Sequence, residues 1–242
     1  MEVVYPPVGI AHITGQIPDL LADRTATAAT LQIACAMQPK AAPHFGTSVV
    51  IMTAFALARL CQDHFGKPAT VLLDMLDNAP ARTVVISDTE YTLCLSHARD
   101  SDSGRTLAEI NTDPVRQLAD WAAQRAGLEY TLRTYRQIQA QPGFRHGLAD
   151  ILSCPDVFTP MFSPSERRLR VRPVCSHCGL VDKTARTVQA RHDSGLTLTY
   201  RCGNHGHQTA RLDDPAAVID ANTPVRTVLR SLCFAHDRAE HG

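Results

Sequence analysis

The sequence has no net charge and lacks the features that would indicate a membrane or secreted protein. Its 24 basic residues balance its 24 acidic residues, so global charge indicates no particular partner. It contains no apolar run of about 18 residues. The N-terminus, Met1–Pro7, has no basic stretch followed by an apolar one. We therefore expect a soluble cytoplasmic protein with no membrane partner.

The composition is that of an ordinary globular protein. Hydrophobic residues make up 44% of the 242 residues and charged residues 20%, and no internal repeat or long low-complexity segment is evident. A chain of this length can bury one full core and carry a smaller satellite. We expect one main domain with an insertion.

The eight cysteines form two groups. Three have metal-type spacing, and the other five lie singly in apolar surroundings: Cys35, Cys61, Cys94, Cys154 and Cys233. Buried thiols in a reducing compartment explain these five better than disulfides do.

The metal-type set consists of two short knuckles. Cys175 and Cys178 form a Cys-x-x-Cys pair, and Cys202-Gly-Asn-His205 closes the set, with 23 residues between Cys178 and Cys202. Such a pair places two thiolates on one tetrahedral zinc ion without strain. The alternating segments 184–191 and 196–200, joined by a turn at 192–195, predict a zinc ribbon with the knuckles at the ends of a β-hairpin. His207 is the rival fourth ligand.

A strand–helix–strand pattern opens the chain. Residues 30–37 form a short apolar run typical of a buried strand, residues 48–65 predict a central helix, and residues 69–73 predict a second buried strand. Two parallel strands joined by one helix make a right-handed βαβ unit.

The rest of the core is predicted from turn and capping signals. Residues 83–87 and 91–96 predict a hairpin. Thr112-Asp113-Pro114 predicts the start of a helix that runs to about Arg125. Residues 127–133 return as a strand, and the proline- and arginine-rich segment 157–173 suits a linker. We predict an α/β, Rossmann-like core over 1–156, an inserted zinc ribbon over 157–212 and a return to the core over 213–242.

The loop before the 48–65 helix is the candidate nucleotide site. It holds Pro43, His44, Gly46 and Thr47. Gly46 would let a backbone approach a ring or a phosphate, His44 could donate to phosphate oxygens, and the helix N-terminus adds a favourable dipole. The structural alternatives are a capping role for His44 and for Thr47.

Two further groups of charged residues can be interpreted as either functional or structural. Asp74 and Asp77 follow the second strand, where ligands bind in open α/β sheets, and are either substrate-binding carboxylates or solvated surface charges. Residues 166–212 hold 9 basic and 3 acidic side chains, a balance of +6. The arginines at 167, 168, 170 and 172 are either a nucleic-acid contact or a solvated basic face.

The segment QPKAAPHFGT resembles the HIGH signature of class I aminoacyl-tRNA synthetases. The later segments GLEYTLRTYRQI, VRPVCSHCG and TYRCGNHGH resemble, in the same order, segments of class I lysyl-tRNA synthetases, across about residues 30–235. That family has a Rossmann fold of the HUP type interrupted by a zinc ribbon. The resemblance therefore implies the same architecture here.

The resemblance assigns roles residue by residue. His44 and Gly46 match the first histidine and the glycine of HIGH, which binds ATP and stabilises the adenylation transition state, and Thr47 replaces its last histidine. Asp74 and Asp77 fall near the family's acidic cluster. Cys175, Cys178 and Cys202 match cysteine ligands, with His205 in place of the fourth.

The chain also departs from this family. Members are about twice as long, and the only lysines here are Lys40, Lys67 and Lys183, so the sequence holds no KMSKS-like loop beyond the ribbon. We expect a truncated, stand-alone paralogue that adenylates lysine or a similar carboxylate with ATP and Mg²⁺, and passes it to tRNA or a carrier protein. The alternatives are a non-catalytic zinc module that binds tRNA or protein, and half of a split synthetase completed by a second chain.

Overall fold

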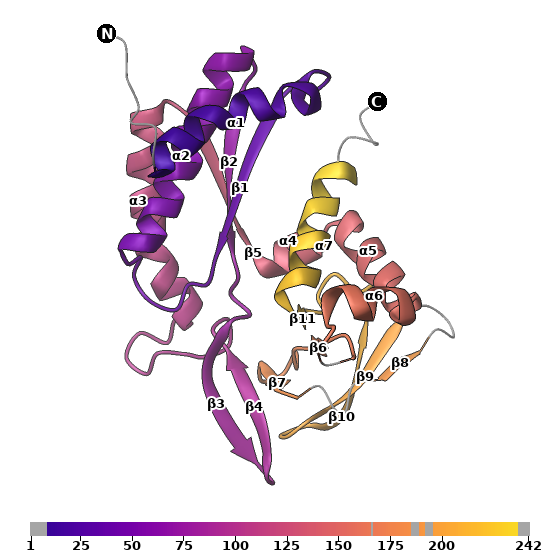
Figure 1. The fold of residues 1–242 in the computed structure, drawn as a ribbon. Coiled ribbons are helices and arrows are strands. Elements are labelled where there is room, and N and C mark those ends of the chain that lie inside the picture. The colour runs from indigo at the N-terminus through magenta and orange to yellow at the C-terminus, as the bar shows by residue number, and fades with distance from the viewer. Residues whose placement is uncertain (1–8, 166, 185–188, 192–195, 237–242) are drawn as a thin grey trace. The chain divides into compact units, whose positions relative to one another are not determined.

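The computed structural model describes residues 9–165, 167–184, 189–191 and 196–236, which form two compact units (Figure 1). The first unit comprises residues up to Leu76 and residues 110–133, and the second comprises residues 77–109 and those from Thr134 onward. The helices are α1 (Gly9–Thr25), α2 (Phe45–Phe65), α3 (Leu107–Ala126), α4 (Tyr135–Gln139), α5 (Pro142–Ser153), α6 (Pro155–Phe162) and α7 (Thr223–His236). The strands are β1 (Leu31–Met37), β2 (Ala69–Met75), β3 (Pro80–Ile86), β4 (Thr89–Cys94), β5 (Glu129–Thr134), β6 (Val171–Pro173), β7 (Leu180–Asp182), β8 (Gln189–Arg191), β9 (Thr197–Cys202), β10 (Gly206–Arg211) and β11 (Ile219–Ala221).

The first unit is built on a parallel three-stranded sheet with the strand order β1-β2-β5. β1 pairs with β2 from Leu31↔Ala69 to Met37↔Met75, and α2 connects the two strands. This confirms the predicted βαβ unit. The fold is mixed α/β, and this strand order is compatible with the predicted Rossmann-like fold because one half of a doubly wound sheet has the same order.

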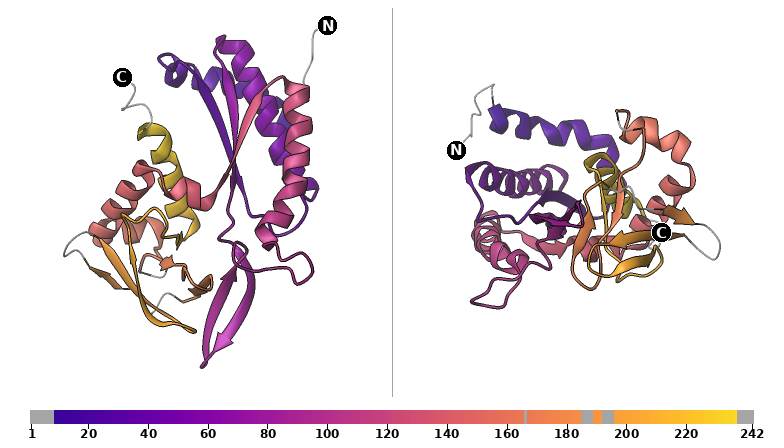
Figure 2. Two further views of the ribbon diagram at one scale, coloured as in Figure 1. Left: turned by 180° about the vertical axis from the view of Figure 1, so that it is seen from behind. Right: turned by 90° about the horizontal axis from the view of Figure 1, so that it is seen from below.

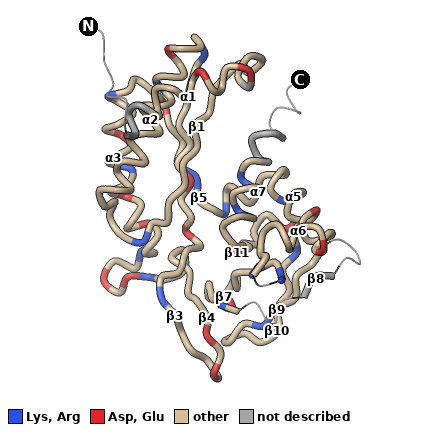
Figure 3. The backbone as a smooth tube through the Cα atoms, viewed as in Figure 1, with Lys and Arg blue, Asp and Glu red and all other residues tan. Residues whose placement is uncertain are grey.

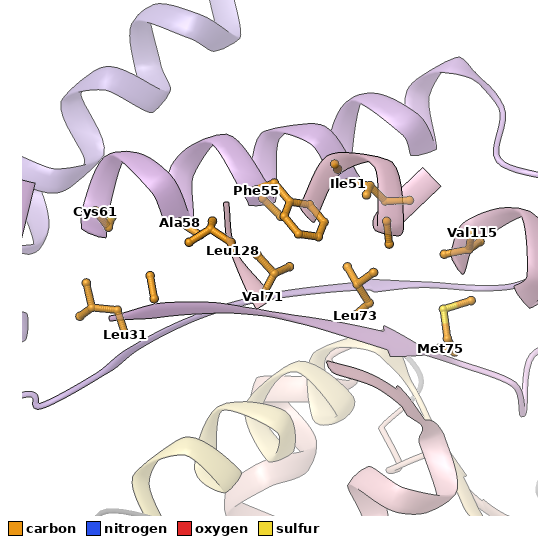
Figure 4. Packing of buried hydrophobic residues seen from close by; sticks show 14 of the residues in the cluster. Leu31, Ile51, Phe55, Ala58, Cys61, Val71, Leu73, Met75, Val115 and Leu128 are labelled. Atoms are coloured by element: carbon orange, nitrogen blue, oxygen red, sulfur yellow. The ribbon is translucent and has the colours of Figure 1, made fainter. Parts of the chain in front are cut away.

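Helices α2 and α3 cover one face of this sheet, and α1 packs against α2 (Figures 1 and 2). Apolar side chains from both layers interlock (Figure 4): Leu31, Ile51, Phe55, Ala58, Cys61, Val71, Leu73, Met75, Val115 and Leu128. Phe55 is 1% exposed, and burying a side chain of this size stabilises the fold by about 1.5–3 kcal/mol. α2 is also long and apolar enough to cross a membrane by length and composition, and 28% of its apolar window is buried within the protein.

Both long helices of the first unit begin earlier than the sequence pattern predicted. α2 starts at Phe45 rather than at 48 and ends at Phe65, followed by the cap residue Gly66, whose φ of 62° lies in the left-handed region. α3 starts at Leu107, because Thr106 and Glu109 form a reciprocal capping box: the Glu109 carboxylate accepts from the Thr106 N–H, and the Thr106 hydroxyl accepts from the Glu109 N–H. The prediction that Pro114 opens this helix was wrong, since Pro114 lies inside it.

The second unit contains three small sheets and the remaining helices. Its sheets have the orders β3-β4-β7, β10-β9-β8 and β11-β6, and α5 packs against α7. The side-chain amide of Gln139 in α4 donates to the carbonyl of Ile219 and accepts from its N–H. This fully buried glutamine therefore fixes β11 to α4.

The hairpin predicted over 83–96 is present as β3 and β4. Its turn consists of Ser87 and Asp88, both with positive φ (48° and 61°), as in a type I′ turn. Neither residue prefers this conformation as asparagine and glycine do.

We predict that the double substitution Ser87→Asn, Asp88→Gly stabilises the protein by about 0.5–1 kcal/mol, because it relieves the left-handed strain of the turn. Urea unfolding of the second unit would measure this. An unchanged or lower midpoint would contradict the assigned turn type.

The two units divide the chain at positions other than the predicted domain boundaries. Residues 77–109 belong to the second unit, and residues from 213 onward are grouped with the cysteine cluster rather than with the sheet of the first unit. The strands predicted over 184–191 and 196–200 correspond to β8 and β9, but β9 also pairs with β10 in a three-stranded sheet. Residues 185–188 and the predicted turn at 192–195 lie outside the described residues.

Candidate metal centre and ligand pocket

Three cysteines and one histidine converge at one point in the second unit. Cys175 and Cys178 lie in the turn between β6 and β7, Cys202 ends β9, and His205 lies in the turn between β9 and β10. Their ligand atoms all lie within 4.8 Å of one another. The two knuckles predicted from the sequence are therefore brought together as one possible metal site.

The separations of these atoms fit a tetrahedral metal ion. The Sγ atoms of Cys178 and Cys202 are 3.5 Å apart, and His205 Nδ1 lies 3.6 Å from the Sγ atoms of Cys175 and Cys202. With Zn–S and Zn–N bonds of about 2.3 and 2.05 Å, a tetrahedron places two sulfurs about 3.8 Å apart, and a sulfur and a nitrogen about 3.6 Å apart. These three separations agree with the tetrahedral values to within a few tenths of an ångström.

A glycine in the left-handed region follows the second ligand of each knuckle. Gly179 follows Cys178 with φ 70°, and Gly206 follows His205 with φ 67°. The N–H of Gly179 donates to the carbonyl of Cys175 at 2.8 Å, which closes the first turn. A Cβ atom at Gly179 would lie 2.2 Å from the Cβ of His97, so only glycine fits there.

The electrostatics of the cluster favour a bound cation. Burial opposes ionisation of Cys175, but the backbone N–H groups of His177 and Cys178 donate to its sulfur, and its pKa lies below the ordinary value. Burial and the neighbouring sulfurs of Cys202 and Cys175 together raise the pKa of Cys178 to about 12. Several adjacent thiolates repel one another unless a metal ion neutralises them, so metal binding would release protons.

The structure distinguishes among the three nearby histidines. His205 belongs to the cluster, whereas His207 lies exposed on β10, paired with Arg201 across the hairpin. His177 is exposed between the two cysteines, as predicted, and its ring lies 5.1 Å from that of His205. The rival assignment of His207 as fourth ligand is therefore not supported by the geometry.

The remaining cysteines agree only in part with the prediction of buried thiols. Cys61 and Cys94 are buried, and burial raises both of their pKa values. Cys35 is half-buried, but Cys154 is exposed, so its prediction was wrong. Cys154 lies at the junction of α5 and α6, which leaves it on the surface. The side chain of Cys233 lies outside the described residues.

A pocket of about 470 Å³ lies in the first unit, at the carboxyl end of β1 and beside the N-terminus of α2. Its lining is formed by Ala36, Met37, Gln38, Pro39, Lys40, Ala41, Ala42, Pro43, His44, Thr47 and Val115. Three of the four residues predicted to bind nucleotide, Pro43, His44 and Thr47, thus share one wall. The fourth, Gly46, is next to the His44 ring but does not line the pocket. The volume is within the range of small-molecule sites.

His44 caps helix α2 with its side chain. Its Nδ1 accepts from the backbone N–H groups of Gly46 at 3.1 Å and of Thr47 at 3.4 Å, and its Nε2 lies 3.2 Å from the Thr47 hydroxyl. An imidazole that accepts at Nδ1 is neutral and carries its proton on Nε2. This confirms the capping alternative for His44. Thr47 is not the cap, since it lies in the first turn.

Gly46 has a steric role in this arrangement. A Cβ atom at this position would lie 3.0 Å from Cε1 of His44 and 3.3 Å from its Nδ1. The missing side chain thus admits the imidazole ring against the first turn of α2.

The two predicted substrate carboxylates both have partners within the protein. Asp74 at the end of β2 is fully buried, and its Oδ1 accepts from Nε and Nη2 of Arg133 at 2.9 and 2.8 Å. Oδ1 of Asp77 accepts from the backbone N–H of Tyr135 at 3.0 Å, and burial raises the Asp77 pKa. The role of Arg133 was not predicted from the sequence. The sequence does not show which carboxylate on a neighbouring strand an arginine will pair with.

The arginines interpreted as either a nucleic-acid contact or a solvated basic face largely have partners inside the second unit. Arg168 donates to the carbonyl of Thr184, and Arg172 donates to the carbonyl of Lys183 and to the carboxylate of Asp220. Arg167 is the exposed member of this group, and Arg168, Arg170 and Arg172 are half-buried. Basic and acidic positions are interspersed along the chain (Figure 3). The geometry therefore favours a structural role for these side chains.

No protein-family model matches this chain, and no curated protein matches it either.

Proposed function

We propose that the chain binds ATP in the pocket at the carboxyl end of β1 and uses it to adenylate an amino acid or a similar small carboxylate, with lysine-like substrates as the first candidates. The observation that carries this proposal is the coincidence of the pocket with the HIGH-like segment. Pro43, His44 and Thr47 line it, and it lies where open α/β sheets bind nucleotides. The resemblance to class I lysyl-tRNA synthetases supplies the reaction class.

The reaction would join the substrate carboxylate to the α-phosphorus of ATP. A carboxylate oxygen attacks the α-phosphorus, the bond from this phosphorus to the bridging oxygen breaks, and pyrophosphate leaves with Mg²⁺. Negative charge builds on the α-phosphate oxygens during this step, so a positioned N–H donor there lowers the barrier. His44 holds its proton on Nε2, the atom that now faces Thr47, and could donate it to such an oxygen after a small rotation.

The metal centre would have a structural role. Cys175, Cys178, Cys202 and His205 would fill all four positions of a tetrahedral zinc ion, which leaves no open position for catalytic water. Zinc would supply folding energy by holding the β6–β7 turn against the β9–β10 turn. The cluster would thereby form the metal site of a zinc ribbon.

Amino-acid-dependent exchange of pyrophosphate into ATP tests the catalytic proposal. We predict that His44→Ala lowers the exchange rate by about 10²–10³-fold, the usual loss when one transition-state donor is removed. It should also cost about 1 kcal/mol of stability, because α2 loses its cap.

A matched variant separates these two effects. His44→Asn keeps a capping side chain but has no imidazole, so its stability should stay near that of the wild type while its exchange rate falls as in His44→Ala. An exchange rate that follows stability, and not the presence of the imidazole, would contradict a catalytic role for His44.

A non-catalytic module is the second candidate, and one observation favours it. Both ring nitrogens of His44 are engaged by the first turn of α2, as expected of a purely structural cap. Under this alternative the wild type exchanges no pyrophosphate with any amino acid, whereas His44→Ala still loses stability.

A further inference from the structure

We propose that Lys40 is the residue that selects phosphate-bearing ligands in the β1–α2 pocket. This inference rests on the proposed function for the identity of the ligand as a nucleoside phosphate. It extends that function by naming the group that binds the anionic end. Nothing in the HIGH-like match assigns a role to this lysine.

The charges of the residues that line the pocket favour an anionic ligand. Among the described residues of the lining, Lys40 is the only one with a fixed charge, and none is an aspartate or a glutamate. A site with one cation and no carboxylate favours anions and disfavours an ammonium group. A lysine-like substrate would therefore place its amine outside this lining, whereas a polyphosphate is compatible with it.

The side chains of the other two lysines already have partners within the protein. Nζ of Lys67 donates to the backbone carbonyls of Thr25 and Ala26, and Nζ of Lys183 pairs with Glu90 at 2.7 Å. Within the described part of the chain, the exposed side chain of Lys40 has no such partner. An ammonium group without a protein partner at the edge of a pocket is available to a ligand.

The backbone around Lys40 is held in place. The N–H of Lys40 donates to the carbonyl of Gln38 at 2.8 Å, and Nδ2 of Asn111 in α3 donates to the carbonyl of the buried Pro39 at 2.9 Å. These two bonds anchor the loop next to the lysine. The cation is thus presented from a fixed backbone position, which lowers the entropy cost of binding.

The N-terminus of α2 cannot supply this charge alone. The N–H groups of Gly46 and Thr47, which would otherwise face an anion, are already occupied by Nδ1 of His44. While His44 caps the helix, Lys40 is therefore the main attraction for phosphate. The apolar part of the wall, which includes Met37, Pro43 and Val115, would pack against the uncharged part of the ligand.

Calorimetric binding of three probes tests the proposal: ATP with Mg²⁺, adenosine, and tripolyphosphate. We expect Lys40→Met to weaken ATP about tenfold, or about 1.4 kcal/mol, with adenosine unchanged. Lys40→Arg should retain most of the affinity. Lys183→Met removes one positive charge in the second unit and serves as the control, which should bind as the wild type does.

The binding results distinguish a failure of the Lys40 assignment from a failure of the proposed ATP binding. If ATP binds equally well to the wild type and Lys40→Met, or if adenosine is weakened as much as ATP, the role of Lys40 is refuted and ATP binding stands. If tripolyphosphate binds through Lys40 but adding the nucleoside gives no gain, the lysine assignment holds and the nucleotide proposal fails. If no probe binds to the wild type, both fail.

Discussion

Replacing Cys202 with serine is expected to abolish metal binding and to unfold much of the second unit. Cys202 is 2% exposed, and its Sγ lies beside both Cys178 and His205, so serine would remove one of four ligands from the centre of the cluster. Zinc content should fall from about one ion per chain to near zero. The free energy of unfolding should fall by more than about 4 kcal/mol, which is a large part of the about 5–15 kcal/mol that a domain has.

Metal analysis, together with thermal unfolding before and after chelation, would measure both effects. Cys154→Ser is the matched control, since Cys154 is exposed and outside the cluster, and it should keep full metal content and stability. A chain purified without metal, whose unfolding midpoint is the same for both variants and insensitive to chelators, would contradict a structural metal centre.

Replacing Asp74 with alanine is expected to destabilise the first unit by about 3–5 kcal/mol, the range for breaking a buried ion pair on one side. The Asp74 side chain is fully buried and that of Arg133 is 14% exposed, so the substitution would leave a guanidinium in the protein without this carboxylate. Chemical denaturation, followed by the signal of the first unit, would measure the loss. The effect is structural, and it should appear without any ligand.

Two further variants make this prediction specific. Asp63→Ala removes the acid of the exposed Arg59–Asp63 pair on α2 and should cost less than about 0.5 kcal/mol. The double variant Asp74→Leu, Arg133→Met replaces the buried pair with apolar side chains and should recover most of the stability. If Asp74→Ala is as stable as Asp63→Ala, the Asp74–Arg133 pair contributes nothing to the fold.

The parts that could be predicted from the sequence are those with a strong local signal. Apolar runs of strand length on both sides of a helix-length segment gave the parallel β1–β2 pair, and the Cys-x-x-Cys and Cys-x-x-His spacings gave the cluster residues. Both patterns constrain the backbone at short range. The true start of α3 also had a local signal, the Thr106-x-x-Glu109 capping box, but the proline at 114 obscured it.

Other features depend on contacts that a single sequence does not display. Asp74 is buried because β5 lies next to β2 in the sheet. Arg172 pairs with Asp220 because β6 pairs with β11. The capping bonds of His44 depend on the rotamer that the missing Cβ of Gly46 allows. In each case, a side chain that the sequence pattern indicated as available to a ligand has a partner within the protein.

An NMR titration of the ¹⁵N-labelled protein with Mg²⁺-ATP would show directly whether the pocket binds nucleotide. We expect saturable shifts of the amide signals of Lys40, Gly46 and Thr47, because these residues surround the pocket and the His44 cap. The amides around the Cys175 knuckle should not shift. An absence of saturable shifts at 38–47, or shifts confined to other residues, would contradict a nucleotide site at the carboxyl end of β1.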